Sequence, residues 1–136
     1  MKKLVILSLS VLAFTLSFTS CSSDNTPGGA LKSYVSALND GDYEEFVDGV
    51  YFNERMSEHR KEKQRAQLLS LARDKGTSEF DQKGGLVRLE ILSEEISEDG
   101  ESAIVEYKKI FGNGEEESGK QKMVKRDDKW LMDMRK

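Results

Sequence analysis

The sequence predicts an α+β domain in which N-terminal helices pack on a curved antiparallel four-stranded sheet. Two observations predict this class. Apolar residues recur at helical spacing up to Gly76, and apolar and polar residues alternate in the segments after it. Asp-Gly and Asn-Gly dipeptides, which favour tight hairpins, separate these later segments. Helices followed by hairpin-linked strands are typical of α+β proteins, and 136 residues suit a single domain.

The first helix is predicted to begin at Pro27, with Thr26 as its N-cap. A threonine oxygen can accept from a free amide of the first turn, and proline is favoured at the first helical position. One apolar stripe then follows at helical spacing: Leu31, Tyr34, Val35 and Leu38. The run Asn39-Asp40-Gly41 ends the helix, because these residues tolerate a left-handed backbone.

Two further helices are predicted before the strands. Asp42 is the expected N-cap of the second, with Glu45 three residues later as in a capping box. Its inner face consists of Phe46, Val47, Val50 and Tyr51. The third covers residues 53–75 and ends at Gly76; its first half is almost all charge, and its second half carries Leu68, Leu69, Leu71 and Ala72. Residues 77–83 fit either a short strand or an ordered loop.

Four strands are predicted over residues 86–96, 102–111, 120–126 and 129–134. Asp99-Gly100 provides a tight turn between the first two. Asn113-Gly114 favours a second tight hairpin, with a longer loop over residues 112–117 as the alternative, and Asp127-Asp128 is a weaker turn before the last strand.

The first strand contains a break in its alternation. A two-residue turn at Asp99-Gly100 places Ile96 opposite Ala103, and counting back from Ile96 by twos reaches glutamates. The alternating apolar residues occupy the other phase: Val87, Leu89 and Ile91. Either these residues face the other way, or one extra residue shifts the phase. A β-bulge near residues 93–95 makes that shift and bends the strand, so we expect a curved sheet.

Residues 1–20 have the features of a secretory signal peptide. A cationic start precedes an apolar run over residues 4–18, which as a helix spans about 22 Å, short of the roughly 30 Å hydrocarbon core of a bilayer. Small residues follow the run, as they do at signal-peptide cleavage sites.

The run Phe18-Thr19-Ser20-Cys21 resembles the bacterial lipobox, although the usual leucine is replaced by Phe18. The resemblance implies cleavage before Cys21 and a lipid anchor on its sulfur, which several acyl chains would make stable. Residues 21–26 are then the lipidated cysteine and a short tether, and residues 27–136 the folded domain. An unmodified thiol beside an ordinary cleavage site is the alternative. The expected location is the cell envelope, anchored to the lipid bilayer, with the domain in the periplasm or on the cell surface.

Composition limits the remaining partners. Residues 1–20 hold two lysines and no acid, so 19 basic residues face 25 acidic ones in the remainder. An acidic balance argues against a nucleic-acid partner, since phosphate binding needs clustered cations. His59 is the only histidine, and lipidation would consume Cys21, so neither a metal site nor a cofactor is predicted.

Longer stretches resemble a known family. They are Gly84-Gly85-Leu86-Val87-Arg88-Leu89-Glu90-Ile91-Leu92-Ser93-Glu94-Glu95, then Ala103-x-Val105, then Met123-Val124-Lys125-Arg126-Asp127-Asp128-Lys129-Trp130, closed by Met132. Residues 27–136 are similar to the lumazine-binding-like family of bacterial envelope proteins, within the nuclear-transport-factor-2-like (NTF2-like), cystatin-like superfamily. The resemblance implies a cone in which helices close one face of a curved sheet, often around a pocket. No catalytic motif accompanies that family, so no catalytic residue is assigned.

Aromatic, valine and methionine side chains are predicted to line such a pocket: Tyr34, Val105, Tyr107, Met123, Trp130 and Met132. The alternative for these residues is a plain core. The face of Ala103 carries no acid in the second strand, and Asp133 lies outside if Trp130 faces inward, although Glu79 or a helix residue could still enter the pocket.

We therefore expect a non-enzymatic domain that binds a small apolar ligand or an envelope protein. Two alternatives remain open at this point. The first is a pocket enzyme, an isomerase or hydrolase, and the second is an accessory structural subunit of an envelope complex.

Overall fold

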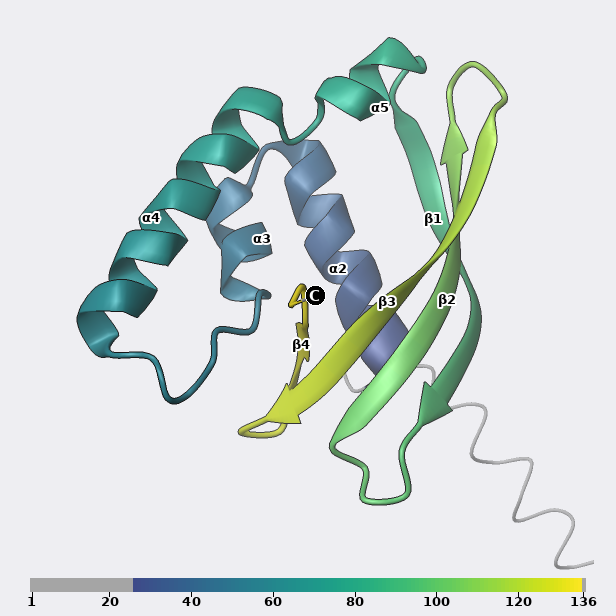
Figure 1. Cartoon of the computed structure of the whole chain (residues 1–136). Helices are drawn as coiled ribbons and strands as arrows, with labels where there is room; N and C mark the ends of the chain where they lie inside the picture. The colour runs from purple at the N-terminus through teal and green to yellow at the C-terminus, as the bar shows by residue number, and fades with distance from the viewer. Residues whose placement is uncertain (1–25, 136) are drawn as a thin grey trace, which may run out of the picture.

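The computed structural model describes residues 26–135, so the predicted signal peptide and Cys21 lie outside the described residues. Helices on one face of an antiparallel sheet confirm the α+β class (Figure 1). The elements are α2 (Pro27–Asp40), α3 (Tyr43–Asp48), α4 (Glu58–Lys75), α5 (Ser78–Gln82), β1 (Leu86–Ile96), β2 (Ser102–Phe111), β3 (Glu116–Arg126) and β4 (Lys129–Met132). Consecutive strands are neighbours in the order β1-β2-β3-β4. Within residues 26–135, no helix combines the length and the apolar character needed to cross a membrane.

The first two helices are capped as the sequence predicts. The Thr26 side-chain oxygen accepts from the amide of Gly29 at 3.0 Å, and Gly41 ends α2 with a left-handed φ of 85°. The Asp42 carboxylate caps α3 by accepting from the amide of Glu45. Short polar side chains at these positions bind amides that the helix itself leaves without partners.

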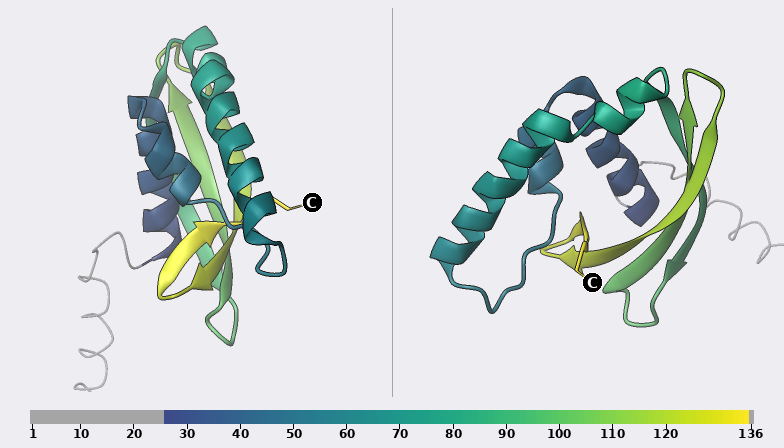
Figure 2. Two further views of the ribbon diagram at one scale, coloured as in Figure 1. Left: turned by 90° about the vertical axis from the view of Figure 1, so that its left-hand side faces the viewer. Right: turned by 45° about the horizontal axis from the view of Figure 1, so that its top comes forward.

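Helix α4 begins later than predicted and stands away from the sheet. Ser57 caps it, and Asn53 instead accepts from the amide of Arg55 in a turn, so the helix starts at Glu58 rather than at residue 53. Ala72 is its one buried residue, and Leu71 is 55% exposed. Figure 2 shows α4 beside α3, on the side of the molecule opposite the central strands.

Residues 77–83 form neither a strand nor a loop, because Ser78–Gln82 is the short helix α5. Phe80 in this helix is buried, with its ring centroid 6.1 Å from that of Phe111 at the end of β2. The burial of one aromatic ring over the end of the sheet supplies the stabilisation that this short helix lacks on its own.

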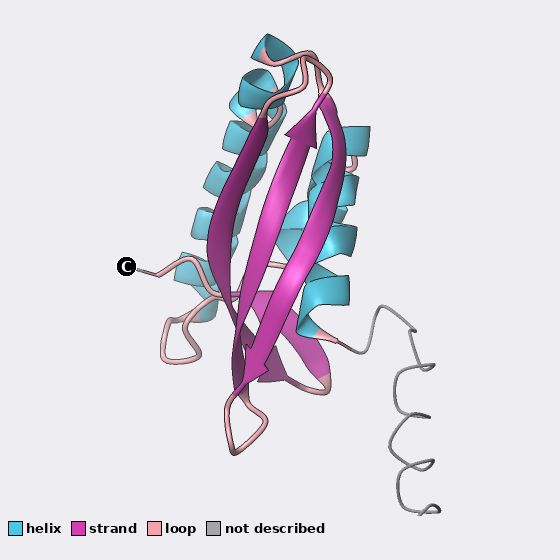
Figure 3. Cartoon of the chain, turned by 90° about the vertical axis from the view of Figure 1, so that its right-hand side faces the viewer, coloured by secondary structure: helices cyan, strands magenta, loops and turns pink. Residues whose placement is uncertain are grey.

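The sheet is curved as expected, and its first strand contains a β-bulge close to the predicted position. Ile96 pairs with Ala103 as predicted, and one extra residue shifts the register between Ile91 and Ser93, slightly earlier than residues 93–95. A second shift follows Leu86. In Figure 3 the three long strands β1, β2 and β3 curve together in front of the helices.

The second hairpin is the tighter of the two alternatives. Gly114 has a φ of 92°, and the amide of Phe111 donates to the carbonyl of Glu115 at 3.0 Å. Strand β3 therefore begins at Glu116 rather than at residue 120. Strand β4 ends at Met132, earlier than the predicted 134, and its Met132 also forms a parallel bridge with Val50.

The buried residues form one core between Ala30 and Met132. Val105 is fully buried and Trp130 is 4% exposed, so the face that both occupy points toward the helices, as predicted. A segment with a core of its own has the property that defines an independently folding domain. Residues 22–136 contain this whole core and are therefore a suitable fragment for binding experiments.

Candidate functional site

An apolar cavity of about 140 Å³ lies between helices α2, α3 and α5 and the concave face of the sheet. Its lining residues are Leu31, Val35, Leu38, Phe46, Phe80, Leu89, Tyr107, Lys109, Gln121, Met132 and Met134. Met134 is 46% exposed, so the cavity is open to solvent at this residue. A mostly apolar hollow with few polar groups is the usual form of a small-molecule site.

The six residues predicted for the pocket divide into two groups. Tyr107 and Met132 line the cavity. Val105, Met123 and Trp130 belong to the packed core and have little or no exposed surface. Tyr34 is also core, because its hydroxyl donates to the carbonyl of Trp130 at 2.6 Å and so ties α2 to β4.

Two glycines allow the aromatic rings to take these positions. A Cβ atom on Gly49 would lie 2.5 Å from the ring of Tyr34. A Cβ atom on Gly119, directly opposite Tyr107 in the sheet, would lie 2.5 Å from the Tyr107 hydroxyl oxygen. The absence of a side chain at Gly119 therefore lets the Tyr107 ring lean over β3 beside the cavity.

Lys109 is the charged residue among the cavity-lining residues that the sequence interpretation missed. It follows Val105 and Tyr107 at intervals of two, so the same alternation places it on the concave face. Its ammonium lies 5.6 Å from the ring centroid of Phe80 and 6.0 Å from that of Tyr107. Both distances are in the range of cation–π attraction, and both rings line the cavity.

Carboxylates near Lys109 are held by another cation. Glu117 lies directly opposite Lys109 in the sheet, but its side chain pairs with Lys83. Glu79 also contacts Lys83, with 3.8 Å between nitrogen and oxygen. Burial raises the pKa of the Tyr107 hydroxyl, and the charge of Glu79 adds to this effect, so Tyr107 is neutral at physiological pH.

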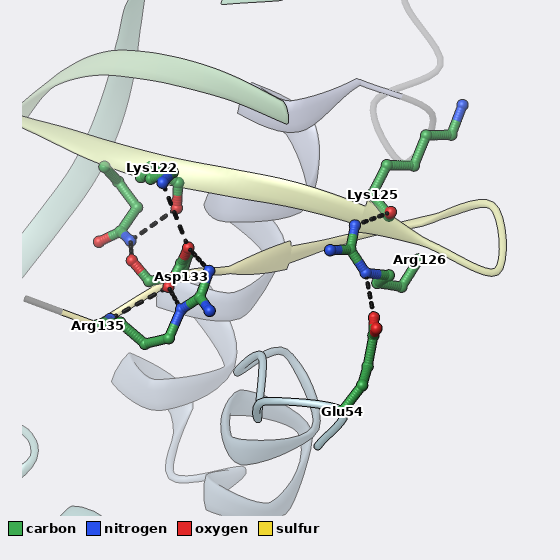
Figure 4. A network of polar contacts seen from close by, with 7 residues as sticks. Glu54, Lys122, Lys125, Arg126, Asp133 and Arg135 are labelled. Carbon is green, nitrogen blue, oxygen red and sulfur yellow. Dashed lines mark hydrogen bonds and ion pairs between the residues drawn. The ribbon is translucent and has the colours of Figure 1, made fainter. Parts of the chain in front are cut away.

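Asp133 differs from its predicted exposure. It lies opposite Lys122 and away from the face of Trp130, as expected, but its side chain is only 1% exposed. Arg135 binds both carboxylate oxygens at 2.8 Å, and the Lys122 ammonium lies at 3.7 Å (Figure 4). Hydrogen bonds from Arg135 lower the pKa of Asp133 to about 2. A carboxylate that stays ionised in this way is a structural anchor and a poor proton acceptor.

A second acid lies on the concave face but takes part in helix capping. The register places Glu94 opposite Val105, so the inner face is not free of acid. Its carboxylate accepts from the amide of Gly28 at 3.2 Å. A negative charge at this helix terminus is stabilising, and it explains why an acid occupies an inward position.

The cavity as described contains no carboxylate, so a proton-transfer pair of acid and tyrosine is not assembled there. Within residues 26–135, no group of three histidine, cysteine, aspartate or glutamate side chains could hold a metal ion. A hollow of this kind can enclose an apolar group and attract a negative charge through Lys109.

A wider groove adjoins the cavity on the side of α4. It has a volume of about 410 Å³ and shares Met134 with the cavity. The residues that line it are Val50, Tyr51, Phe52, Gln64, Gln67, Leu68, Leu71, Met134 and Arg135. This groove exists because α4 does not pack onto the sheet.

Comparison with known proteins identifies the family. The model of a domain of unknown function, DUF4878, matches residues 19–132. The chain belongs to the DUF4878 family. No curated protein matches it significantly. The more specific resemblance to lumazine-binding-like proteins stays a prediction.

Two solved structures share the fold of this DUF4878 chain. A Campylobacter jejuni crystal structure, provisionally described as an NTF2-like transpeptidase, has a TM-score of 0.67 and 20% identity, covering 81% of this chain and 99% of that one. The solution structure of a SEC-C motif containing protein from Rhodopseudomonas palustris has a TM-score of 0.51 and 19% identity, covering 87% and 81%. At these identities the similarity shows an NTF2-like fold and no shared activity.

Proposed function

We propose that this DUF4878 chain is a lipid-anchored protein of the bacterial cell envelope whose folded domain binds a small ligand without catalysing a reaction. The observation that carries the binding role is the apolar cavity, which is open to solvent and has no carboxylate among its lining residues. The anchor is inferred from residues 1–21, where a signal-like segment ends at Cys21.

The sequence and the fold both support a binding domain that is held close to a membrane by a lipid anchor. A short tether of residues 22–26 would hold the domain within about 17 Å of the bilayer surface when fully extended. The domain begins with α2 at Pro27, so the tether would enter the fold directly at a capped helix. The finer resemblance to lumazine-binding-like envelope proteins agrees with the same location.

Metabolic labelling tests the anchor. Cells that express the full chain are grown with radiolabelled palmitate, and the protein is isolated beside its Cys21→Ala and Ser22→Ala variants. We expect label in the wild-type protein and in Ser22→Ala, and none in Cys21→Ala. Equal labelling of all three, or none in any, would contradict the lipid anchor while leaving the fold unaffected.

One observation favours an accessory subunit as a second candidate. Leu71 and Met134 are 55% and 46% exposed and line the same groove beside α4. Exposed apolar residues that share a groove are a feature of protein contact sites. This candidate expects the chain to co-purify with an envelope protein, and expects a Leu71→Lys variant to lose that partner.

A further inference from the structure

We propose that the cavity binds a compact organic monoanion, a carboxylate carried on a single ring or on a chain of about six carbons, with the Lys109 ammonium as its charge partner. This inference rests on the proposed function, because it names the class of ligand for the same cavity.

The volume of the cavity sets the size of the apolar part of the ligand. At about 140 Å³ the cavity is close to engineered apolar cavities of roughly 150 Å³, which hold one benzene molecule. Leucine, phenylalanine and methionine side chains supply most of its wall. An apolar group of that bulk gains contact with these side chains, whereas a sugar or a nucleotide would leave its polar groups without partners.

Lys109 determines the sign of the charge that the ligand should carry. It is the one charged residue among those described as lining the cavity. Its ammonium lies between the rings of Phe80 and Tyr107, which attract a cation but provide no anionic partner. A carboxylate at this point would form a charge-assisted hydrogen bond with the ammonium.

The surrounding acids are committed to other partners in the described part of the chain. Glu79 and Glu117 contact Lys83, and Glu94 binds the first turn of α2. None of the ion pairs formed within residues 26–135 includes Lys109. The amide nitrogen of Gln121 donates to the carbonyls of Lys122 and Asp133, so Lys109 is the charged donor that remains for the ligand, beside the neutral Tyr107 hydroxyl.

Methionine-methyl NMR on residues 22–136 provides the test. Met132 and Met134 line the cavity, while Met56 lies between α3 and α4 and serves as an internal reference. The protein is titrated with hexanoate, hexan-1-ol and hexylammonium, which share a six-carbon chain and differ in charge. We expect hexanoate to shift the signals of Met132 and Met134 and to bind about tenfold more tightly than the other two.

Matched variants assign the preference to one side chain. Lys109→Met keeps an apolar stem and removes the charge, and Lys109→Arg keeps the charge. Lys120→Met is the control, because Lys120 is exposed and lies opposite Glu106 in the register of β2 and β3. Both residues are on the face of the sheet that points away from the cavity. We expect the preference for hexanoate to vanish in Lys109→Met, with hexan-1-ol affinity within about twofold of wild type, and to persist in Lys109→Arg and Lys120→Met.

The outcomes separate this inference from the proposed function. Equal affinity of the wild-type protein for all three probes, or a preference that survives in Lys109→Met, would overturn the anion assignment and leave a binding cavity in place. If no probe moved the signals of Met132 and Met134, the cavity would not be a binding site, and both proposals would fail.

Discussion

The two ends of the concave face are filled in different ways. At one end Ala103, Met123 and Trp130 pack under α2, and the Tyr34 hydroxyl donates to the backbone of β4. At the other end Tyr107 and Lys109 face an open hollow, which residues of α2, α3 and α5 line on the helical side. One strand, β2, supplies residues to both ends. The helices that lie over a sheet therefore decide whether an inward side chain becomes core or cavity wall.

The helix that would close the open end does not do so. Helix α4 carries six basic residues and three acids, and Ala72 is its only buried residue. A helix with so little apolar surface gains little by packing against the sheet. The groove beside Leu68 and Leu71 is the result.

The largest expected contrast compares two methionines. Met123→Ala at the packed end, where the side chain is fully buried, should reduce the free energy of unfolding by about 2 to 5 kcal/mol. Met134→Ala at the open end, 46% exposed, should reduce it by less than about 1 kcal/mol. Urea unfolding monitored by circular dichroism measures both. Equal losses would show that the two ends are equally packed.

Ionised Asp133 should contribute to the free energy of unfolding at neutral pH, and this contribution should be lost in acid. Its pKa is lowered to about 2 in the folded protein from an ordinary 3.8, so the ionised form stabilises the fold above about pH 4, and this contribution is lost as the pH falls through 2. Allowing for solvent around the half-exposed Arg135, we expect about 1 to 2 kcal/mol.

Urea unfolding at pH 7 and at pH 2 measures this contribution. Asp133→Asn should be less stable than the wild type at pH 7 and nearly equal to it at pH 2. Asp128→Asn is the control, because Asp128 is exposed in the turn before β4. A difference between wild type and Asp133→Asn that did not change with pH would contradict the role of the carboxylate.

A smaller contrast compares two tyrosines. Tyr34→Phe removes the hydrogen bond to the carbonyl of Trp130 at the packed end, and we expect a loss of about 1 kcal/mol. Tyr107→Phe at the open end, where the ring is only half-buried, should change stability by less than about 0.5 kcal/mol. Thermal unfolding of both variants at neutral pH gives the comparison, and a greater loss for Tyr107→Phe would reverse the assignment of the two ends.

Local chemistry explains which features could be predicted from the sequence. The caps at Thr26 and Asp42, the bounds of β1 and β2 and the pairing of Ile96 with Ala103 depend on neighbouring residues and on turn geometry. The division of the concave face could not be predicted in the same way. Alternation places Trp130 and Tyr107 on one face, but it contains no information on which helix covers each of them.

Side-chain contacts that the alternation does not encode account for two of the errors. Residues 77–83 become α5 because Phe80 is buried against Phe111, a contact across the fold. Asp133 lies on the predicted side of β4 but is buried, since Arg135 and Lys122 cover it. Lys109 lies two residues after Tyr107 in β2, so the same alternation predicts its inward position.

The central claim is that the open end of the cone holds an apolar hollow with one cation. A crystal structure of residues 22–136 grown with hexanoate tests it most directly. The account predicts the six-carbon chain between Phe80, Leu89 and Met132, with its carboxylate within hydrogen-bond distance of the Lys109 nitrogen. Side chains of Phe80 and Met134 filling this space, with α4 packed against the sheet, would contradict the account.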